Sequence, residues 1–209
     1  MQSNINKTAA LEAGGIMRQL IEDGVLDPAV AKRVRPTPPR IGDKSQHVLN
    51  YLAAEQLPDA SRPGRTLSMD RLLEWLSGHC EQRSQRIDPL KIDVPAVTEV
   101  MSFAFAQRHR ILAVAVTPQE VVIAGAEPFI GGWEKDLQQV LRRPIRRVLA
   151  DPESIDRFTV EFYSLAKSVR GASGDSRSGG QANANLEQLL EISNLKDLDA
   201  NDGHVAIRL

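Results

Sequence analysis

Three short runs of β-branched and aliphatic residues, separated by helical patterns, constrain the fold of this chain more than any other feature. They are Ile111 to Val116, Val121 to Ala124 and Ile145 to Leu149. Thr117 to Glu120 supplies turn residues between the first two runs, which predicts a hairpin. The full alternation extends from Ile87 to Arg170 in the order helix, strand, strand, helix, strand, helix. This order predicts an α/β (α+β) module with helices packed on a small mixed sheet.

Apolar residues at helical spacing predict the helices of this module. The first helix carries Val97, Val100, Met101 and Ala104, and the second carries Trp133, Leu137, Val140 and Leu141. The last helix begins after Asp151, which can cap it, with Pro152 in its first turn. Its predicted core-facing stripe is Ile155, Phe158, Phe162, Leu165 and Val169.

Composition divides the chain into five segments. They are a flexible or short-helical N-terminal segment (1–40), a helical subdomain (41–86), the α/β module (87–170), a Gly/Ser-rich linker (171–184) and a tail (185–209). The first 15 residues look poorly ordered, and the proline-rich stretch 35–40 reads as an extended linker. Within the subdomain, Ser45 and Ser68 are the predicted caps of two helices. A short helix is predicted over 186–192.

An ordered set of motifs resembles a known family. The set is IDPLKID (87–93), a helix ending in Ala106-Gln107-Arg108-His109, a strand closing on AGAEPF (124–129), Trp133, and EFYSLAKSVRG (161–171). Over roughly residues 45 to 170 it resembles the N-terminal, MshEN-like region of type II secretion and type IV pilus assembly ATPases. The tail 185–204 resembles the segment that leads into their ATPase core. The resemblance implies a bacterial, cytoplasmic docking and regulatory domain that is peripheral at the inner membrane. Its implied partner is the cytoplasmic part of a membrane platform protein, with the ATPase core as a second candidate.

The sequence does not contain the loop that catalysis in that family requires. ATP hydrolysis there needs a GxxxxGK[ST] loop that cradles the phosphates. Residues 42–45 (Gly-Asp-Lys-Ser) resemble this loop superficially but lack the adjacent Gly and Lys. We therefore expect no catalysis, no catalytic residues and no cofactor in these 209 residues, which form either an isolated N-terminal piece or a shortened relative.

Histidine and cysteine positions predict no reactive or metal-binding cluster. His79 and Cys80 are neighbours in sequence, but a thiolate–imidazole pair requires side chains that face each other. Cys80 is expected to be a buried structural residue and His109 a surface residue. The histidines are scattered, with no pair at zinc-ligand spacing; they are His47, His79, His109 and His204.

Six arginines form the candidate partner-binding set: Arg108, Arg110, Arg142, Arg143, Arg146 and Arg147. Together they suit an acidic protein surface, a phosphate ligand or lipid headgroups, and the alternative is an ordinary solvated surface. Nucleic acid is not expected, because the net charge is −1 and no aromatic residues interleave with the arginines. The sequence also contains no apolar run near the roughly 20 residues that span a bilayer.

The alternative function is sensing of a nucleotide second messenger, cyclic-di-GMP. Many members of the resembling family carry the motif RLGxxLVxxGxI, and the nearest match here is Gly15 to Leu26. Leu20, Ile21, Gly24 and Leu26 fit it. Gly15 and Met17 replace its arginine and first glycine, so the planar partner for a guanine or phosphate is missing and cyclic-di-GMP binding is doubtful.

Overall fold

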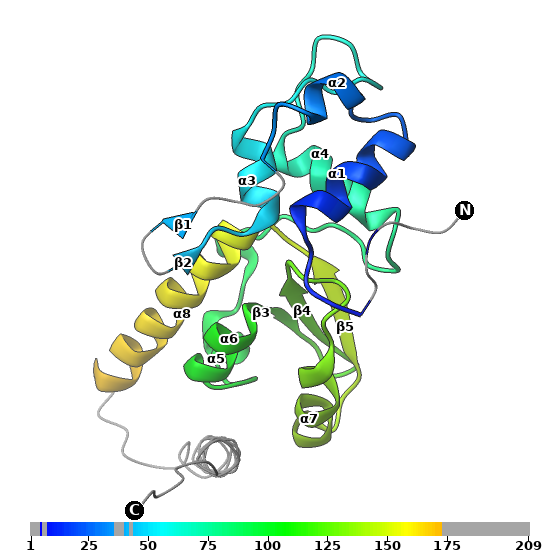
Figure 1. Cartoon of the computed structure of the whole chain (residues 1–209). Helices are drawn as coiled ribbons and strands as arrows, with labels where there is room; N and C mark the ends of the chain where they lie inside the picture. The colour runs from blue at the N-terminus through cyan, green and yellow to red at the C-terminus, as the bar shows by residue number, and fades with distance from the viewer. Residues whose placement is uncertain (1–4, 6–7, 36–39, 42–43, 173–209) are drawn as a thin grey trace, which may run out of the picture.

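The computed structural model describes residues 5, 8–35, 40–41 and 44–172 of the chain. Its fold is α+β, as predicted, with a small mixed sheet of order β3-β4-β5 (Figure 1). β3 (Ile111–Val116) and β4 (Val121–Gly125) are antiparallel, while β4 and β5 (Ile145–Leu149) are parallel. The predicted hairpin is confirmed, because the N–H of Thr117 donates to the carbonyl of Glu120 at the turn.

The sheet forms the centre of one hydrophobic core. The first four residues of β3 and of β4 are all buried, which explains why these runs are continuously apolar rather than alternating. α7 (Gly132–Leu141) connects β4 to β5 and buries Trp133 and Leu137. Figure 1 shows α5 and α6 beside β3, and α7 beside β5.

The helix predicted around residues 97–104 is two helices. After a short 3-10 turn, η1 (Pro89–Lys91), the chain forms α5 (Val94–Thr98) and then α6 (Phe103–His109). Ser102 begins the second helix, because its hydroxyl accepts a hydrogen bond from the N–H of Phe105. The predicted apolar stripe of this helix ends at Met101, because the chain breaks between α5 and α6. Ala104, the next residue of the predicted stripe, is exposed.

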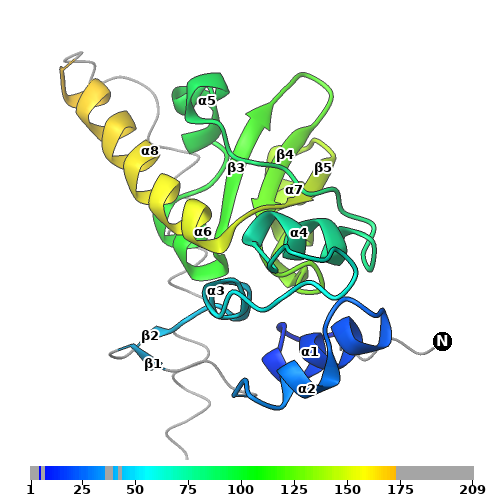
Figure 2. The ribbon, with the colours of Figure 1, turned by 90° about the horizontal axis from the view of Figure 1, so that it is seen from above.

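The last helix, α8 (Pro152–Ala172), starts as predicted, with the Asp151 carboxylate accepting from the N–H of Glu153. The predicted stripe is right for its first half, since Ile155, Phe158 and Phe162 are buried. It is wrong beyond that point, where Leu165 is 52% and Val169 50% exposed. The buried face continues instead through Ala166, so Leu165 lies beside it, and Figures 1 and 2 show the C-terminal end of α8 extending away from the sheet.

The N-terminal part packs as a second hydrophobic cluster. Its helices are α1 (Ala13–Glu22), α2 (Pro28–Ala31), α3 (Val48–Ala54) and α4 (Met69–Ser77), with a small ladder of β1 (Arg40–Ile41) and β2 (Lys44–Ser45). The expectation of poor order before residue 16 is wrong for Ile5, Leu11 and Ala13, which are buried in this cluster. Residues 36–39 of the predicted proline-rich linker, the Gly/Ser-rich linker beyond Ala172 and the predicted tail helix lie outside the described residues.

One of the two predicted caps in this part is confirmed. The Ser68 hydroxyl accepts from the N–H of Arg71 at the start of α4. Ser45 does not cap α3; His47 does, through Nδ1, which accepts from the N–H of Leu49. Ser45 instead lies in β2, so the helix starts later than its sequence pattern indicates.

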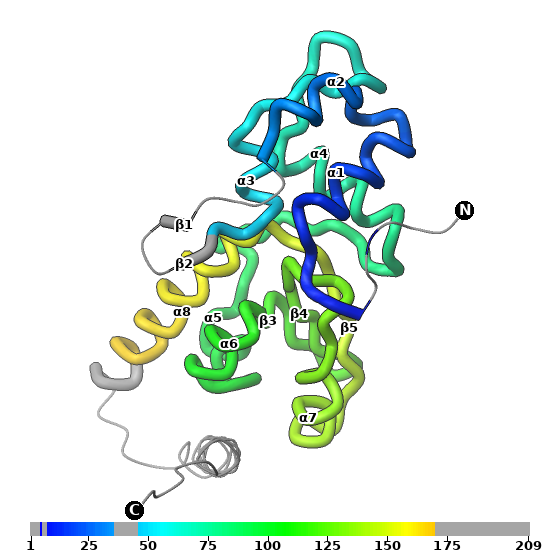
Figure 3. Tube along the Cα trace, in the orientation of Figure 1, coloured from blue at the N-terminus to red at the C-terminus, as the bar shows by residue number. Residues whose placement is uncertain are grey.

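Two elements join the N-terminal cluster to the module. Leu149, the last residue of β5, is fully buried in the N-terminal cluster, and Ser84 pairs with it in a parallel bridge. The loop after β4 provides the second link, because the Glu127 carboxylate accepts from the N–H of Leu11 and lies 3.1 Å from His47 Nε2. The trace in Figure 3 shows the segment before α1 passing beside the sheet at this point.

Candidate functional site

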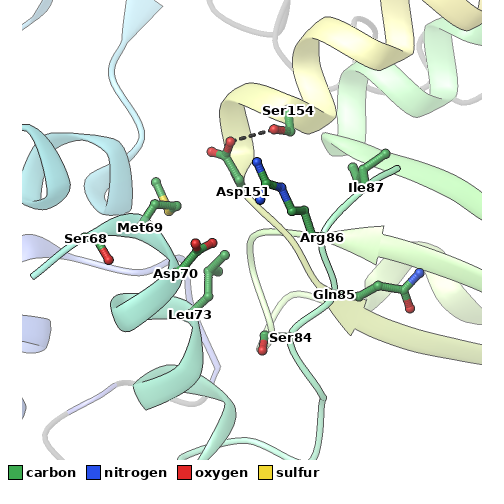
Figure 4. A pocket seen from close by; sticks show the side chains of 10 residues that line it. All are labelled: Ser68, Met69, Asp70, Leu73, Ser84, Gln85, Arg86, Ile87, Asp151 and Ser154. Atoms are coloured by element: carbon green, nitrogen blue, oxygen red, sulfur yellow. Dashed lines mark hydrogen bonds between the residues drawn. The ribbon is translucent and has the colours of Figure 1, made fainter. Parts of the chain in front are cut away.

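Within the part of the chain that the structure describes, two hollows lie where the helices meet the sheet. The larger, about 530 Å³, is at the junction between α4 and the start of α8 (Figure 4). Its walls are Ser68, Met69, Asp70, Leu73, Ser84, Gln85, Arg86, Ile87, Asp151 and Ser154. In Figure 4, the Arg86 side chain points toward Asp151 and Ser154, and Asp70 faces it from α4.

The charges of this junction hollow do not favour an anion. Arg86 is exposed and makes no hydrogen bond or ion pair with the residues that the structure describes. Two carboxylates, Asp70 and Asp151, share the hollow with this one guanidinium. Asp151 is already engaged by the Ser154 hydroxyl, at 2.6 Å. The same Asp151 carboxylate also accepts from the N–H of Glu153, so the Ser154–Asp151 pair belongs to the cap of α8.

The smaller hollow, about 190 Å³, is rich in basic side chains and is called the basic hollow below. It lies between the end of α6, the sheet, the loop after β4 and the start of α7. Its walls are Arg108, His109, Arg110, Ile111, Ile123, Gly125, Glu127, Ile130, Trp133 and Arg147. Three arginines of the predicted set therefore meet around one cavity, although they come from positions almost 40 residues apart in sequence.

Arg147 is the most firmly held of these arginines. Its Nη2 donates to the carbonyls of Glu127 and Ile130 at 3.0 and 2.8 Å, and its guanidinium carbon lies 5.3 Å from the centre of the Trp133 ring. The side chain is only 17% exposed, and burial lowers the pKa of Arg147. The nearest carboxylate is that of Glu134, at 3.6 Å. The positive charge is thus paired with the Glu134 carboxylate and further stabilised by two carbonyl dipoles and an aromatic face.

Arg110 and Arg108 differ in how they are paired. Arg110 ends α6 in the left-handed conformation and forms a forked contact with Asp156 of α8, at 2.6 Å for the closer nitrogen. Its pKa is raised by that hydrogen bond. Arg108 is exposed and has neither a hydrogen bond nor an ion pair within the described chain. Arg108 is therefore the available cation at the rim of the basic hollow.

His109 is not the surface residue that the sequence indicated. It is half-buried, with its ring 4.5 Å from that of Phe105. Burial lowers the pKa of His109, and the neighbouring charge of Arg108 lowers it further. A neutral imidazole near pH 7 follows, so the positive charge of the hollow comes from its arginines.

The remaining three predicted arginines form a separate group at the other end of β5. Arg146 pairs with Glu120 at 2.9 Å, and Arg143 Nη1 donates to the carbonyl of Thr117. Arg142 ends α7 in the left-handed conformation. Consecutive strand residues point to opposite faces of a sheet, so Arg146 and Arg147 cannot serve one surface. The predicted single basic face is thus two groups, which the strand alternation of β5 separates.

The other ionisable candidates serve the structure. His79 Nε2 lies 2.7 Å from Asp23 Oδ2, which also accepts from Trp75 Nε1. Cys80 is part-buried, and its thiol donates to the carbonyl of Leu76, so it does not face His79 as a reactive pair. Within the described ranges, no group of three or more His, Cys, Asp or Glu side chains is placed to hold a metal ion.

The segment that resembles the cyclic-di-GMP motif forms α1 and the turn after it. Leu20 and Leu26 are buried, and the carbonyl of Leu20 accepts from the N–H groups of Val25 and Leu26. Gly24 has a φ of 68°, which favours glycine. The matching residues of the motif therefore have a structural role, because they form the buried end of α1 and the turn that follows it. The position of the motif arginine is Gly15, which is buried.

Sequence reasoning missed Glu127 and the wall formed by Trp133. In the sequence these two residues stood out only as parts of the family motifs, AGAEPF (124–129) and Trp133, although both line the basic hollow. The signal in the sequence for this wall was the run Gly131-Gly132-Trp133, in which a large aromatic residue follows two glycines. Gly131 packs so closely on Arg147 that a Cβ there would lie 2.9 Å from Nη1.

Comparison with known proteins confirms the resemblance inferred from the motifs. Residues 83–169 match the MshEN domain. Over 190 residues, the chain is 30% identical to the type IV pilus assembly ATPase TfpB of Acinetobacter baylyi (strain ATCC 33305 / BD413 / ADP1). This match covers 90% of the chain and 32% of that protein, so the chain spans about a third of its curated relative. A solved structure of MshE with cdg aligns with 71% of this chain and 98% of its own, at a TM-score of 0.41 and 16% identity.

The helices were also compared with the requirements of a bilayer. Among the described residues, no helix combines the length and the apolar character that a membrane span needs. This includes α8, whose 21 residues carry several charged side chains.

Proposed function

From the MshEN domain at residues 83–169, we propose that this chain is a non-catalytic docking and regulatory domain of a type II secretion or type IV pilus assembly ATPase. In this proposal it couples the motor to the cytoplasmic part of an inner-membrane platform protein by protein–protein contact. The observation that carries the proposal is the 30% identity to a pilus assembly ATPase over most of the chain. Such a domain would be cytoplasmic and peripheral at the membrane through its partner.

The surfaces of the structure are compatible with docking. Arg142, Arg143 and Arg146 lie at one end of the sheet, where Arg146 is half exposed and paired only with Glu120. Exposed arginines of this kind add little to stability, since solvent-exposed ion pairs contribute roughly 0–1 kcal/mol. They are well suited to steer an acidic partner and to fix its register.

Binding to the platform protein tests the proposal directly. The chain would be titrated with the purified cytoplasmic domain of the platform protein from the same organism, using bio-layer interferometry at two salt concentrations. We expect saturable binding that weakens at higher salt and that the double charge reversal R142E/R143E reduces. The matched control is K32E/R33E, which reverses two exposed charges beside α2, far from the sheet. A wild-type chain that shows no saturable binding would refute docking to this partner.

Catalysis and nucleotide sensing are tested separately. We expect the purified chain to hydrolyse no ATP above the buffer background, because it carries no GxxxxGK[ST] loop. Calorimetric titration with cyclic-di-GMP is expected to show no binding, because Gly15 supplies no guanidinium at the motif's arginine position. Micromolar binding that is lost on mutation of residues 15–26 would make second-messenger sensing the preferred function.

A further inference from the structure

The basic hollow combines three features that a recognition pocket for one acidic side chain requires. Its walls combine apolar residues of the sheet with the Trp133 ring, three of its lining residues are arginines, and one of these, Arg108, has no partner within the described chain. Its only lining carboxylate, Glu127, is already occupied by the N–H of Leu11 and by His47. No side chain of the described part therefore neutralises Arg108.

We propose that the basic hollow receives a single carboxylate, presented by an acidic segment of the protein partner, between Arg108 and the Arg147–Trp133 pair. This inference rests on the proposed docking function and specifies the chemistry of the contact. It also assigns the six predicted arginines unequal roles, because only Arg108, Arg110 and Arg147 reach this cavity.

Preorganisation supports the proposal. Arg147 is fixed by two carbonyls and by the Trp133 ring, and Arg110 is held by Asp156, before any ligand arrives. Only Arg108 has to lose side-chain freedom on binding, which limits the entropic cost. The largely buried charge of Arg147, paired with one carboxylate at 3.6 Å, gains a second counter-charge when an anion enters.

The size of the cavity selects among anions. Pockets for drug-sized ligands and cofactors usually enclose about 300–1,000 Å³. The basic hollow encloses about 190 Å³, which accommodates one side-chain carboxylate but not a nucleotide. The apolar walls, Ile111, Ile123 and Ile130, suit the methylene groups of an aspartate or glutamate side chain. A protein segment supplies such a group together with its backbone, whereas a free inorganic anion leaves those walls without a contact.

Nuclear magnetic resonance with short peptides tests the pocket without the platform protein. The full chain would be titrated with a capped hexapeptide, Gly-Gly-Glu-Glu-Gly-Gly, and with its Gln-for-Glu counterpart, at constant ionic strength. The reporters are the Trp133 indole N–H and the backbone N–H of Ile130, which line the hollow. The other indole, that of Trp75, is bonded to Asp23 and serves as an internal control.

We expect the glutamate peptide to shift both reporters and the glutamine peptide to leave them unchanged. The variant R108A should bind the glutamate peptide about tenfold more weakly, as expected for loss of a charge-assisted hydrogen bond. The variant R86A removes another exposed arginine, which has no partner among the described residues, from the other hollow, and it should bind as the wild type does. Both substitutions lie on exposed side chains, and unchanged circular dichroism and thermal midpoints would verify the fold.

Three results would overturn the proposal. They are equal shifts with the two peptides, unchanged binding by R108A, and sulfate shifting the same reporters at lower concentration than the glutamate peptide, which would indicate a site for tetrahedral anions. Failure of the pocket and failure of the proposed docking function give different results. If R108A still binds the platform domain normally, the docking surface lies elsewhere. If the platform domain fails to bind while the glutamate peptide binds, the carboxylate pocket is supported and the platform protein is not its partner.

Discussion

His47 and Glu127 meet across the boundary between the N-terminal helices and the sheet, with Nε2 and Oε1 3.1 Å apart. The other ring nitrogen, Nδ1, accepts from the N–H of Leu49, so the proton of a neutral ring resides on Nε2 and is donated to Glu127. The same carboxylate accepts from the N–H of Leu11. One acidic residue thus joins the segment before α1, the start of α3 and the wall of the basic hollow.

Replacing Glu127 with alanine should loosen this junction. The substitution leaves the N–H of Leu11 and the Nε2–H of His47 without an acceptor in a part-buried place, which costs about 1–3 kcal/mol. We expect a lower urea midpoint and faster hydrogen exchange at Leu11. Glu55→Ala removes an exposed carboxylate at the end of α3 and is the matched control. Unchanged exchange at Leu11 in E127A would show that the carboxylate does not hold the segment.

Asp59 should govern part of the acid unfolding. It is 2% exposed; burial alone would raise its pKa, but hydrogen bonds from Ser61 and Arg71 together lower the pKa below its ordinary value. A carboxyl with a depressed pKa in the folded state stabilises the protein above its unfolded-state pKa, and this stability is lost as the pH falls through the folded pKa. Stability should therefore decline below about pH 4.

The variant Asp59→Asn tests this prediction. It should lower stability at neutral pH by about 1.5–3 kcal/mol, the usual contribution of hydrogen bonds to a charged group, and flatten the decline in acid. Thermal midpoints measured from neutral to acid pH report both effects. Asp70→Asn, at an exposed position in the first turn of α4, is the control. An acid limb in D59N that is as steep as in the wild type would exclude this role.

Two apolar positions of α8 should respond very differently to truncation. Phe162 is 4% exposed and packs in the main core, while Leu165 is 52% exposed. Phe162→Ala should destabilise the fold by roughly 3–5 kcal/mol, because it leaves a cavity. Leu165→Ala should change stability by about 0.5 kcal/mol or less, as at ordinary surface positions. The free energies of unfolding of both variants, measured by chemical denaturation, test this prediction. A large loss of stability in L165A would mean that this face of α8 is covered in solution.

Neighbouring arginines on β5 provide another paired test. Arg147→Met removes the donors to the carbonyls of Glu127 and Ile130, and we expect a loss of about 1–3 kcal/mol with an altered Trp133 fluorescence. Arg146→Met, one residue earlier on the opposite face, removes a solvent-exposed pair and should alter neither. Equal effects of the two substitutions would contradict the assignment of opposite faces.

Local sequence patterns predicted many features of the fold correctly. The hairpin, the β5 run and the caps at Ser68 and Asp151 depend on neighbours within a few residues, and such neighbours are visible in a sequence. The break at Ser102 is also local in cause, but the apolar spacing on both sides of it imitates one continuous helix.

The candidate site could be predicted only in part. Its arginines were recognised as a basic set, but nothing in their spacing separates Arg146 from Arg147 or places Arg108 beside Trp133. Glu127 was missed because its partners, Leu11 and His47, lie 116 and 80 residues away. Contacts over such separations leave no periodic signal in the chain.

The sequence by itself determined the three strands of the α/β module, its last two helices and their order, because hydrophobic spacing and turn chemistry act between neighbours along the chain. It also determined the family resemblance, through motifs kept in order. Only the tertiary structure decided which charges share a cavity, which half of α8 is buried and how the N-terminal segment is held. Those outcomes depend on where distant elements cross, and the packing of the whole chain sets that geometry.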